Sequence, residues 1–243
     1  MNLLSSASIF SFFTLISRIL GYLRDILIAF FLGASIIADA FFVAFRLPNT
    51  FRRLFAEGTF NAAFIPSYTS AKLENKKIGK SFADEVLTIL SIILLFIVTL
   101  AEIFTPYLVY IIAPGFITDD FKFNLAVEFT RITFPFLFFV SLSSFFSGIL
   151  NSNNKFAAAA AAPIFLNIIL IASILFSYFE NLDFAKNLSY GVTVAGIVQL
   201  IFLIFVSYKF YKPKIKFDLR TSKKVNFFFK KLLPSIFSSG VTQ

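Results

Sequence analysis

The sequence predicts an all-α, polytopic membrane protein, on the evidence of its composition and of the continuity of its apolar runs. Of the 243 residues, 58% are hydrophobic, only 14% are charged and 38 are phenylalanine, a balance far outside that of soluble domains. The run at residues 90–100 is almost continuously apolar, whereas a strand of a transmembrane barrel alternates apolar and polar residues. The membrane spans are therefore predicted to be helices.

Six apolar runs reach the ~20 residues that a helix needs to cross a bilayer. The first has no Lys or Arg ahead of it, exceeds the length of a secretory signal and precedes no small-residue cleavage site, so we expect a retained helix. A seventh run begins at Leu232 and stops after 12 residues, which predicts the truncated start of a further helix. The six crossings are predicted at residues 3–33, 36–68, 86–112, 127–150, 157–179 and 188–208.

The later runs carry few polar residues, and most of these have a structural interpretation. Glu102 in the third run has no assigned role. Arg131 opens the fourth run as an interface anchor. The alanines at 157–162 predict a close-packing surface at the start of the fifth run, and Asn167 follows as an amide that either bonds a neighbouring helix or faces a cavity.

Basic residues gather in the second, fourth and sixth connections, which places these connections and the N-terminus in the cytoplasm. The net charge of +9 mostly reflects this asymmetry, so nucleic-acid binding is not expected. Residues 211–231 are either an interfacial segment on the anionic inner leaflet or a solvated linker. The expected domains are a transmembrane lobe at 1–210, a basic cytoplasmic connector at 211–231 and the start of a seventh helix at 232–243.

Five arginines lie in the first two runs, where a charge near the bilayer centre costs about 2.5 to 3.5 kcal/mol on insertion scales. At ~1.5 Å per residue, Arg24 and Arg46 lie about 14 Å from the turn at residues 33–36, and Arg18 and Arg52 lie about 22 to 24 Å from it. Both pairs are too deep in the membrane to reach its outer face. We therefore expect two tiers of positive charge to face each other across one helical hairpin. The five are Arg18, Arg24, Arg46, Arg52 and Arg53.

Internal ion pairs account for only part of this charge. Asp25 reaches Arg18 only if the helix breaks at Gly21, and Glu57 lies one turn after Arg53, where an i,i+4 pair forms. A voltage sensor would repeat Arg at every third position, which this sequence does not do. What remains is a hydrated, cationic cavity for an anion, since guanidinium offers phosphate a planar fork of donors.

Pro48 and Asn49 interrupt the second run between the arginines. Proline frees a backbone carbonyl, which a membrane helix tolerates only where the backbone lines protein or water, and the Asn49 amide adds hydrogen-bonding capacity. The chain has no Cys and no His, and neither a metal cluster nor a nucleophile with a base occurs in the predicted spans. We therefore expect no metal site, no cofactor and no enzymatic activity.

Five segments of the sequence are distinctive: SRILGYLRD, ADAFFVAFRLPNTFRRLFAEGTFNAAFIP, APGF, RITFPFLFFVSLSSFFSGILNS and LLPSIFSSGVTQ. In these segments the sequence resembles the MurJ, or MviN, family of bacterial lipid II flippases, a branch of the multidrug/oligosaccharidyl-lipid/polysaccharide exporter superfamily.

The resemblance implies the first lobe of a two-lobe fold. It also implies that undecaprenyl-pyrophosphate-linked disaccharide pentapeptide, lipid II, moves from the cytoplasmic to the periplasmic leaflet of the inner membrane by alternating access, for cell wall synthesis. The expected partners are lipid II and membrane lipids, and the energy source, membrane potential or a coupling ion, stays open.

The resemblance also implies roles for individual residues. The family's pyrophosphate-holding cluster maps onto Arg18, Arg24 and Arg52, although internal charge pairing stays an alternative for all three. Asp39 is either a gate or proton-linked group, or a partner of the helix dipole. The expected substrate-binding residues are Arg18, Arg24, Asp25, Asn49, Arg52, Asn167 and Gln243, and the expected gating or structural charges are Asp39, Arg46, Arg53 and Glu57.

Three other functions compete with a lipid II flippase. An exporter of another polyprenyl-pyrophosphate glycan would bind the same pyrophosphate. A multidrug antiporter of the same superfamily needs a carboxylate-rich cavity, whereas this hairpin has five arginines against three acids. A membrane scaffold that binds division proteins through the basic connector would tolerate the loss of Arg18 or Arg52.

Overall fold

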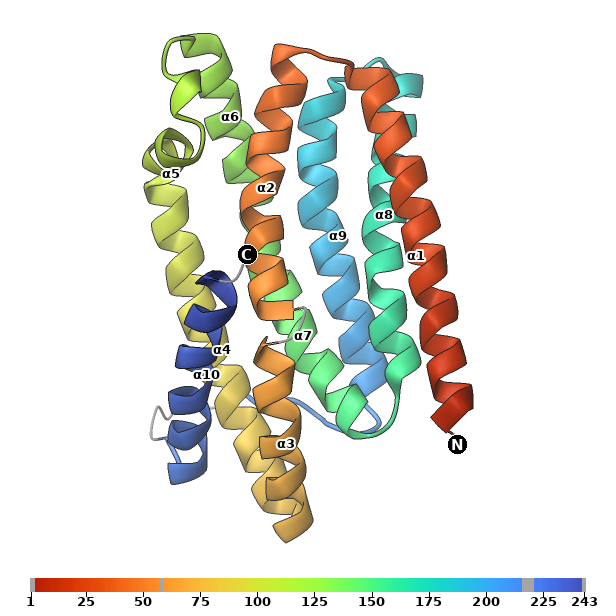
Figure 1. The fold of residues 1–243 in the computed structure, drawn as a ribbon, viewed down its shortest axis with the longest axis vertical. Helices are drawn as coiled ribbons and strands as arrows, with labels where there is room; N and C mark the ends of the chain where they lie inside the picture. Colours follow the sequence, from red (N-terminus) through yellow and green to blue (C-terminus); the bar gives the residue numbers. More distant parts are fainter. Residues whose placement is uncertain (1–2, 57–58, 216–220, 242–243) are drawn as a thin grey trace.

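The computed structural model is a bundle of helices, and no strand occurs in the part of the chain that it describes (Figure 1). It describes the backbone of residues 3–56, 59–215 and 221–241, and the side chains of residues 8–46, 48–50, 60–215 and 221–232. Four helical stretches within these ranges are long and apolar enough to cross a membrane, and they confirm the prediction of an all-α, polytopic membrane protein. They are residues 76–103, 120–152, 156–180 and 184–207.

Each predicted crossing corresponds to one helix or to two consecutive helices. The first is α1 (Leu3–Leu32), the fifth α8 (Phe156–Glu180) and the sixth α9 (Phe184–Ser207). The second, third and fourth are each divided. They are α2 (Ile36–Ala56) with α3 (Thr59–Glu74), α4 (Lys76–Ile103) with α5 (Thr105–Ile112), and α6 (Asp120–Thr133) with α7 (Phe136–Ser152). A short 3-10 helix, η1 (Pro114–Phe116), precedes α6, and α10 (Lys223–Val241) follows the six predicted crossings.

Glycine and short polar residues mark the ends of these helices. Gly33 ends α1 with a φ of 58°, a left-handed conformation that glycine adopts without strain. Among the described residues, a side-chain oxygen accepts a backbone N–H in the first turn of five helices, which satisfies a donor that the helix itself leaves free. These caps are Ser35 for α2, Asn75 for α4, Asp119 for α6, Asp183 for α9 and Ser222 for α10.

Pro48 does not end α2, because a neighbouring helix satisfies the carbonyl that this proline frees. The missing N–H leaves the carbonyl of Ala44, four residues earlier, without its helical donor. The hydroxyl of Thr133 on α6 donates to that oxygen at 3.1 Å, and both residues are fully buried. The expectation that the freed backbone faces protein is thus confirmed, and this bond fixes α2 against α6.

Side-chain hydroxyls also satisfy backbone carbonyls at the breaks in the other two divided crossings. Pro106 frees the carbonyl of Glu102 at the break between α4 and α5, and the Thr105 hydroxyl donates to it at 3.0 Å. At the break between α6 and α7, the hydroxyl of Thr193 on α9 donates to the carbonyl of Ile132. A hydroxyl therefore replaces a lost helical hydrogen bond where water is scarce.

The helices pack in two groups that share α7 and α9. α1 packs on α8, α8 packs on α9, and α9 packs on α7, whereas α2 packs on α6 and α7 (Figure 1). α1 and α2 leave the turn after Gly33 toward different partners and make no extensive contact with each other. The two helices therefore do not pack on each other as a hairpin, because each buries its apolar face on another part of the bundle. That two tiers of positive charge face each other stays a prediction, since the side chains of Arg52 and Arg53 lie outside the described residues.

The connector after α9 is held against α4 by a buried carboxylate. Asp84 is 3% exposed and accepts three hydrogen bonds, from the Tyr211 hydroxyl at 2.7 Å, the Lys214 backbone N–H at 3.1 Å and the Lys80 ammonium at 2.8 Å. Burial, followed by the Asp84 hydrogen bond, raises the pKa of Tyr211. Beyond it, α10 begins at Lys223, inside the stretch predicted as connector, so the domain boundaries stay a prediction.

Candidate functional site

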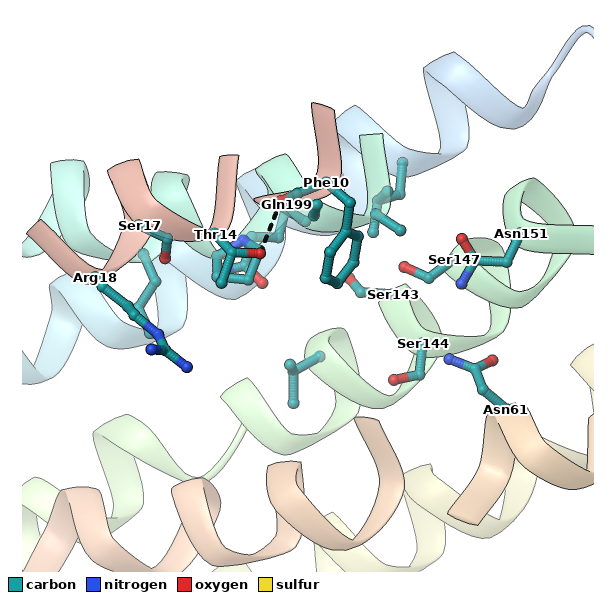
Figure 2. A pocket seen from close by; sticks show the side chains of 17 residues that line it. Phe10, Thr14, Ser17, Arg18, Asn61, Ser143, Ser144, Ser147, Asn151 and Gln199 are labelled. Atoms are coloured by element: carbon teal, nitrogen blue, oxygen red, sulfur yellow. Dashed lines mark hydrogen bonds between the residues drawn. The ribbon is translucent and has the colours of Figure 1, made fainter. Parts of the chain in front are cut away.

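A cavity of about 470 Å³ lies between α1 and α7, with α3, α8 and α9 completing its wall (Figure 2). Arg18 is the one charged residue among the described side chains that line it. The other polar lining residues are neutral: Thr14, Ser17, Asn61, Ser143, Ser144, Ser147, Asn151 and Gln199.

Helical spacing explains why these side chains share one space. On α1, Thr14 and Arg18 are four residues apart, which places them on the same face of the helix. On α7, Ser143, Ser147 and Asn151 repeat at every fourth position, and this face also meets the cavity. Packing then brings the two faces together through α8 and α9.

A glycine brings Asn61 of α3 to this cavity. A Cβ at Gly148 on α7 would lie 2.6 Å from Asn61 Oδ1 and 2.7 Å from the Phe64 ring. Such distances are too short for any side chain, so the close approach of α3 to α7 requires glycine at this position. Asn61 and Ser144 consequently lie near one another in the cavity wall (Figure 2).

Arg18 has no charged partner among the residues that the structure describes. Its guanidinium extends from α1 into the space beside α7 (Figure 2), and it forms neither an ion pair nor a hydrogen bond with any residue of the described ranges. The break at Gly21 that a pair between Asp25 and Arg18 would require does not occur, because α1 runs unbroken through Gly21, and Asp25 pairs with Arg24 instead.

Arg24 lies one turn and a half further along α1 and is held from two sides. Its Nε and Nη2 donate to Asp25 Oδ1 at 2.9 and 2.7 Å, and its Nη1 donates to Asn167 Oδ1 at 2.8 Å. The Arg24 side chain is 16% exposed, whereas that of Asp25 is 64% exposed. The guanidinium is thus oriented by α8, and its carboxylate partner is open to solvent.

Asn167 joins α8 to α1 at this point. It is 5% exposed, and its Nδ2 donates to the backbone carbonyl of Ser17 at 2.8 Å while its Oδ1 accepts from Arg24. Gly21 faces the amide, since a Cβ there would lie 3.6 Å from Asn167 Nδ2. The amide thus bonds a neighbouring helix, which is one of the two alternatives raised by the sequence. Asn167 is not among the residues that line the cavity, so its role in substrate binding stays a prediction.

Of the remaining predicted residues, those that the structure describes do not join this cluster. Asp39 on α2 forms an ion pair with Lys122 of α6 and is half exposed. Arg46 is exposed and has no ion-pair partner within the described part of the chain. Asn49 is partly buried and interacts with another residue. The side chains of Arg52 and Arg53, and all of Glu57 and Gln243, lie outside the described residues.

Sequence reasoning missed the polar face of α7. The stretch SLSSFFSGILNS contains the cavity-lining Ser143, Ser144, Ser147 and Asn151. Their spacing of four within an apolar run was the available signal, because a polar stripe on a membrane helix faces the bundle interior. The arrangement as a whole offers a cation for an anionic group beside neutral donors and acceptors.

Comparison with known proteins places the chain in one family. The family described as "Lipid II flippase MurJ" matches residues 28–243. A protein of Rickettsia prowazekii called "Probable lipid II flippase MurJ" is 40% identical over 248 residues, which cover 100% of this chain and 48% of that protein. A protein of Rhizobium tropici with the same name is 42% identical over 236 residues, which cover 95% of this chain and 44% of that protein.

A solved structure shows the same fold. "Lipid II flippase MurJ, inward closed conformation" superposes with a TM-score of 0.81 at 29% sequence identity and covers 96% of this chain and 48% of that chain. The chain therefore spans about half the length of the curated relatives and of the solved structure that it matches.

Proposed function

The chain belongs to the MurJ family of lipid II flippases, and from this premise we propose that it forms the first lobe of such a flippase. In this proposal Arg18, Arg24 and Arg52 hold the pyrophosphate of lipid II while the protein moves the lipid-linked muropeptide from the cytoplasmic to the periplasmic leaflet. Lipid II and the surrounding membrane lipids are its partners.

One observation supports this proposal above the others, the unpaired guanidinium of Arg18 in a polar cavity. A charge inside a membrane bundle is expensive, and it is retained where it pairs with another group or binds a ligand. Since no described residue pairs with Arg18, the missing partner is an anion. Guanidinium binds phosphate oxygens through two parallel hydrogen bonds, so a pyrophosphate fits this requirement.

Arg24 would be the second contact to the same anion. Its guanidinium is already oriented by Asn167, so little conformational entropy is lost when a ligand binds. Its partner Asp25 is 64% exposed and is free to turn toward water when a diphosphate approaches. Arg24 thereby exchanges one anionic partner for another without leaving its position.

The location of the cavity agrees with loading from the cytoplasm. It is lined by Asn151 at the end of α7 and by Ala159 at the start of α8, close to the connection at 153–155. That end of the bundle also carries the N-terminus (Figure 1). With the positive-inside orientation, in which the N-terminus is cytoplasmic, the cavity lies in the half of the inner membrane from which lipid II departs.

The charge of the site argues against a multidrug antiporter. Such a transporter attracts cations with carboxylates, whereas no carboxylate lines the described cavity and its single charge is positive. An exporter of a different polyprenyl-pyrophosphate glycan would use the same contacts, and family membership favours lipid II over it.

The test is rescue of bacteria depleted of their own lipid II flippase by the complete gene. We expect wild type to restore growth, and Arg18→Ala, Arg24→Ala and Arg52→Ala to fail at normal protein levels. Arg131→Ala is the matched control, since Arg131 is an exposed arginine on α6 outside the cavity. Rescue by all three of these arginine variants would refute the proposal.

A further inference from the structure

We infer that the neutral polar wall of the cavity binds the hydroxyl- and amide-bearing part of the ligand, which in a lipid-linked glycan is the sugar attached to the phosphate. This inference rests on the proposed function, because it takes Arg18 as the anion-binding end of the same cavity. The polar wall consists of Ser143, Ser144, Ser147 and Asn151 of α7, Asn61 of α3 and Gln199 of α9.

The polar wall has unused hydrogen-bonding capacity. Elsewhere in the bundle, helical serines such as Ser91 and Ser173 donate to a carbonyl four residues earlier. No side chain of the polar wall forms a hydrogen bond with a residue that the structure describes. Asn61 Oδ1, Ser143 Oγ and Asn151 Oδ1 are in addition buried. Buried polar atoms normally have partners, so these atoms indicate a ligand.

Convergence on one cavity, rather than an unpaired hydroxyl alone, carries this inference. Ser141 on α7 and Thr130 on α6 also have buried hydroxyl oxygens without a partner, yet neither lines the cavity. They are isolated, whereas the six side chains of the polar wall face one space beside the guanidinium of Arg18 (Figure 2). Ser141 therefore serves as a matched control.

The chemistry of the polar wall defines the class of ligand. Hydroxyls and amides both donate and accept, as the hydroxyl and acetamido groups of a sugar do. An acyl chain would leave all six polar groups unsatisfied, and a cationic group finds no carboxylate among the described lining residues. The volume of about 470 Å³ lies within the ~300 to 1,000 Å³ typical of small-molecule sites.

The arrangement along α7 also gives the ligand a direction. Ser143 and Asn151 are eight residues apart, or about 12 Å along the helix, with Ser147 between them on the same face. Arg18 of α1 lies toward the Ser143 end of this row, away from Asn151 (Figure 2). The phosphate therefore lies toward mid-membrane, and the sugar extends along α7 toward the connection at 153–155.

Two probes and three variants of the complete gene product test this inference. The probes are undecaprenyl pyrophosphate, which has no sugar, and lipid II, which has the same pyrophosphate with a disaccharide. We expect the double variant Ser143→Ala/Asn151→Ala to bind lipid II about 10-fold more weakly, since each neutral hydrogen bond contributes a factor of roughly 2 to 10. Its binding of undecaprenyl pyrophosphate should change less than about 2-fold.

Stability measurements separate a binding role from a packing role. Since Ser143 Oγ and Asn151 Oδ1 have no partner to lose, the double variant should keep the thermal midpoint of wild type. Ser141→Ala should leave the affinity for both probes unchanged. If the double variant does not fold, Ser144→Ala/Ser147→Ala replaces it, because these residues lie in the same wall.

The outcomes distinguish this inference from the proposed function. Equal weakening of both probes by the double variant, or an unchanged affinity for both, overturns the sugar subsite. Arg18→Ala should weaken both probes alike. If Arg18→Ala leaves both affinities unchanged, the proposed anion site fails, whatever the α7 variants do.

Discussion

Two substitutions of Asn167 separate the structural role of this amide from its effect on the charge of Arg24. Asn167→Ala removes the hydrogen bond from Arg24 Nη1 and the one to the Ser17 carbonyl, both of 2.8 Å. Interhelical hydrogen bonds in membranes contribute about 0.6 kcal/mol on average and about 1.7 at most, whereas those to charged groups reach ~1.5 to 3. We expect a loss of about 1 to 3 kcal/mol, or roughly 2 to 10 °C in thermal midpoint for a chain of this size.

Asn167→Asp perturbs the charge instead. The new carboxylate keeps an acceptor beside Arg24, so stability should fall less than in Asn167→Ala. It also adds a negative charge near the proposed pyrophosphate site. At ~8 Å and an effective dielectric constant of ~20, two unit charges repel by about 2 kcal/mol, which predicts about 30-fold weaker binding of undecaprenyl pyrophosphate.

The assay measures thermal midpoint and undecaprenyl pyrophosphate affinity for both variants of the complete gene product. Asn187→Ala is the control, because the Asn187 amide donates to Ser177 between α8 and α9 at 2.9 Å, outside the cavity. Wild-type affinity in Asn167→Asp would refute the reasoning. So would a loss of affinity in Asn187→Ala as large as that in Asn167→Asp.

Three further predictions concern the packing around the site. Gly148→Ala places a Cβ 2.6 Å from Asn61 Oδ1, so it should lower the free energy of unfolding by ~1 to 3 kcal/mol. The thermal midpoint measures this loss. An unchanged midpoint would contradict the close approach of α3 and α7. Thr133→Val should lower the free energy of unfolding by ~1 kcal/mol, because it removes the hydrogen bond to the Ala44 carbonyl. The loss should be smaller in a Pro48→Ala background, where residue 48 regains its N–H. Equal losses in both backgrounds would show that the Thr133 hydroxyl does not replace the helical hydrogen bond that Pro48 removes. Because the pKa of Tyr211 is raised by burial and by the Asp84 hydrogen bond, the neutral phenol favours the folded state, and stability is lost as pH rises above about 10. Tyr211→Phe should show a shallower fall in thermal midpoint between pH 9 and 11, and identical slopes would refute this assignment.

The identity of the charged residues followed from the sequence, but their pairing did not. The cost of charge in a membrane singled out five arginines, and the family resemblance grouped Arg18, Arg24 and Arg52 as one cluster. The environments of Arg18 and Arg24 differ because Asn167, 143 positions after Arg24, bonds Arg24 and not Arg18. That choice depends on how α8 lies against α1, which no spacing within α1 reveals.

Sequence alone determined the helical membrane character of the chain and the family to which it belongs. The helical spans depend on local composition, because an apolar run of sufficient length partitions into lipid wherever its neighbours lie, whereas the family follows from the residues of particular segments. Tertiary structure decided that α1 and α2 separate, that Arg18 stays unpaired and that α7 presents a polar wall to it. Hydrogen bonds act over about 3 Å and in fixed directions, so they form or fail according to the packing of helices far apart in the chain.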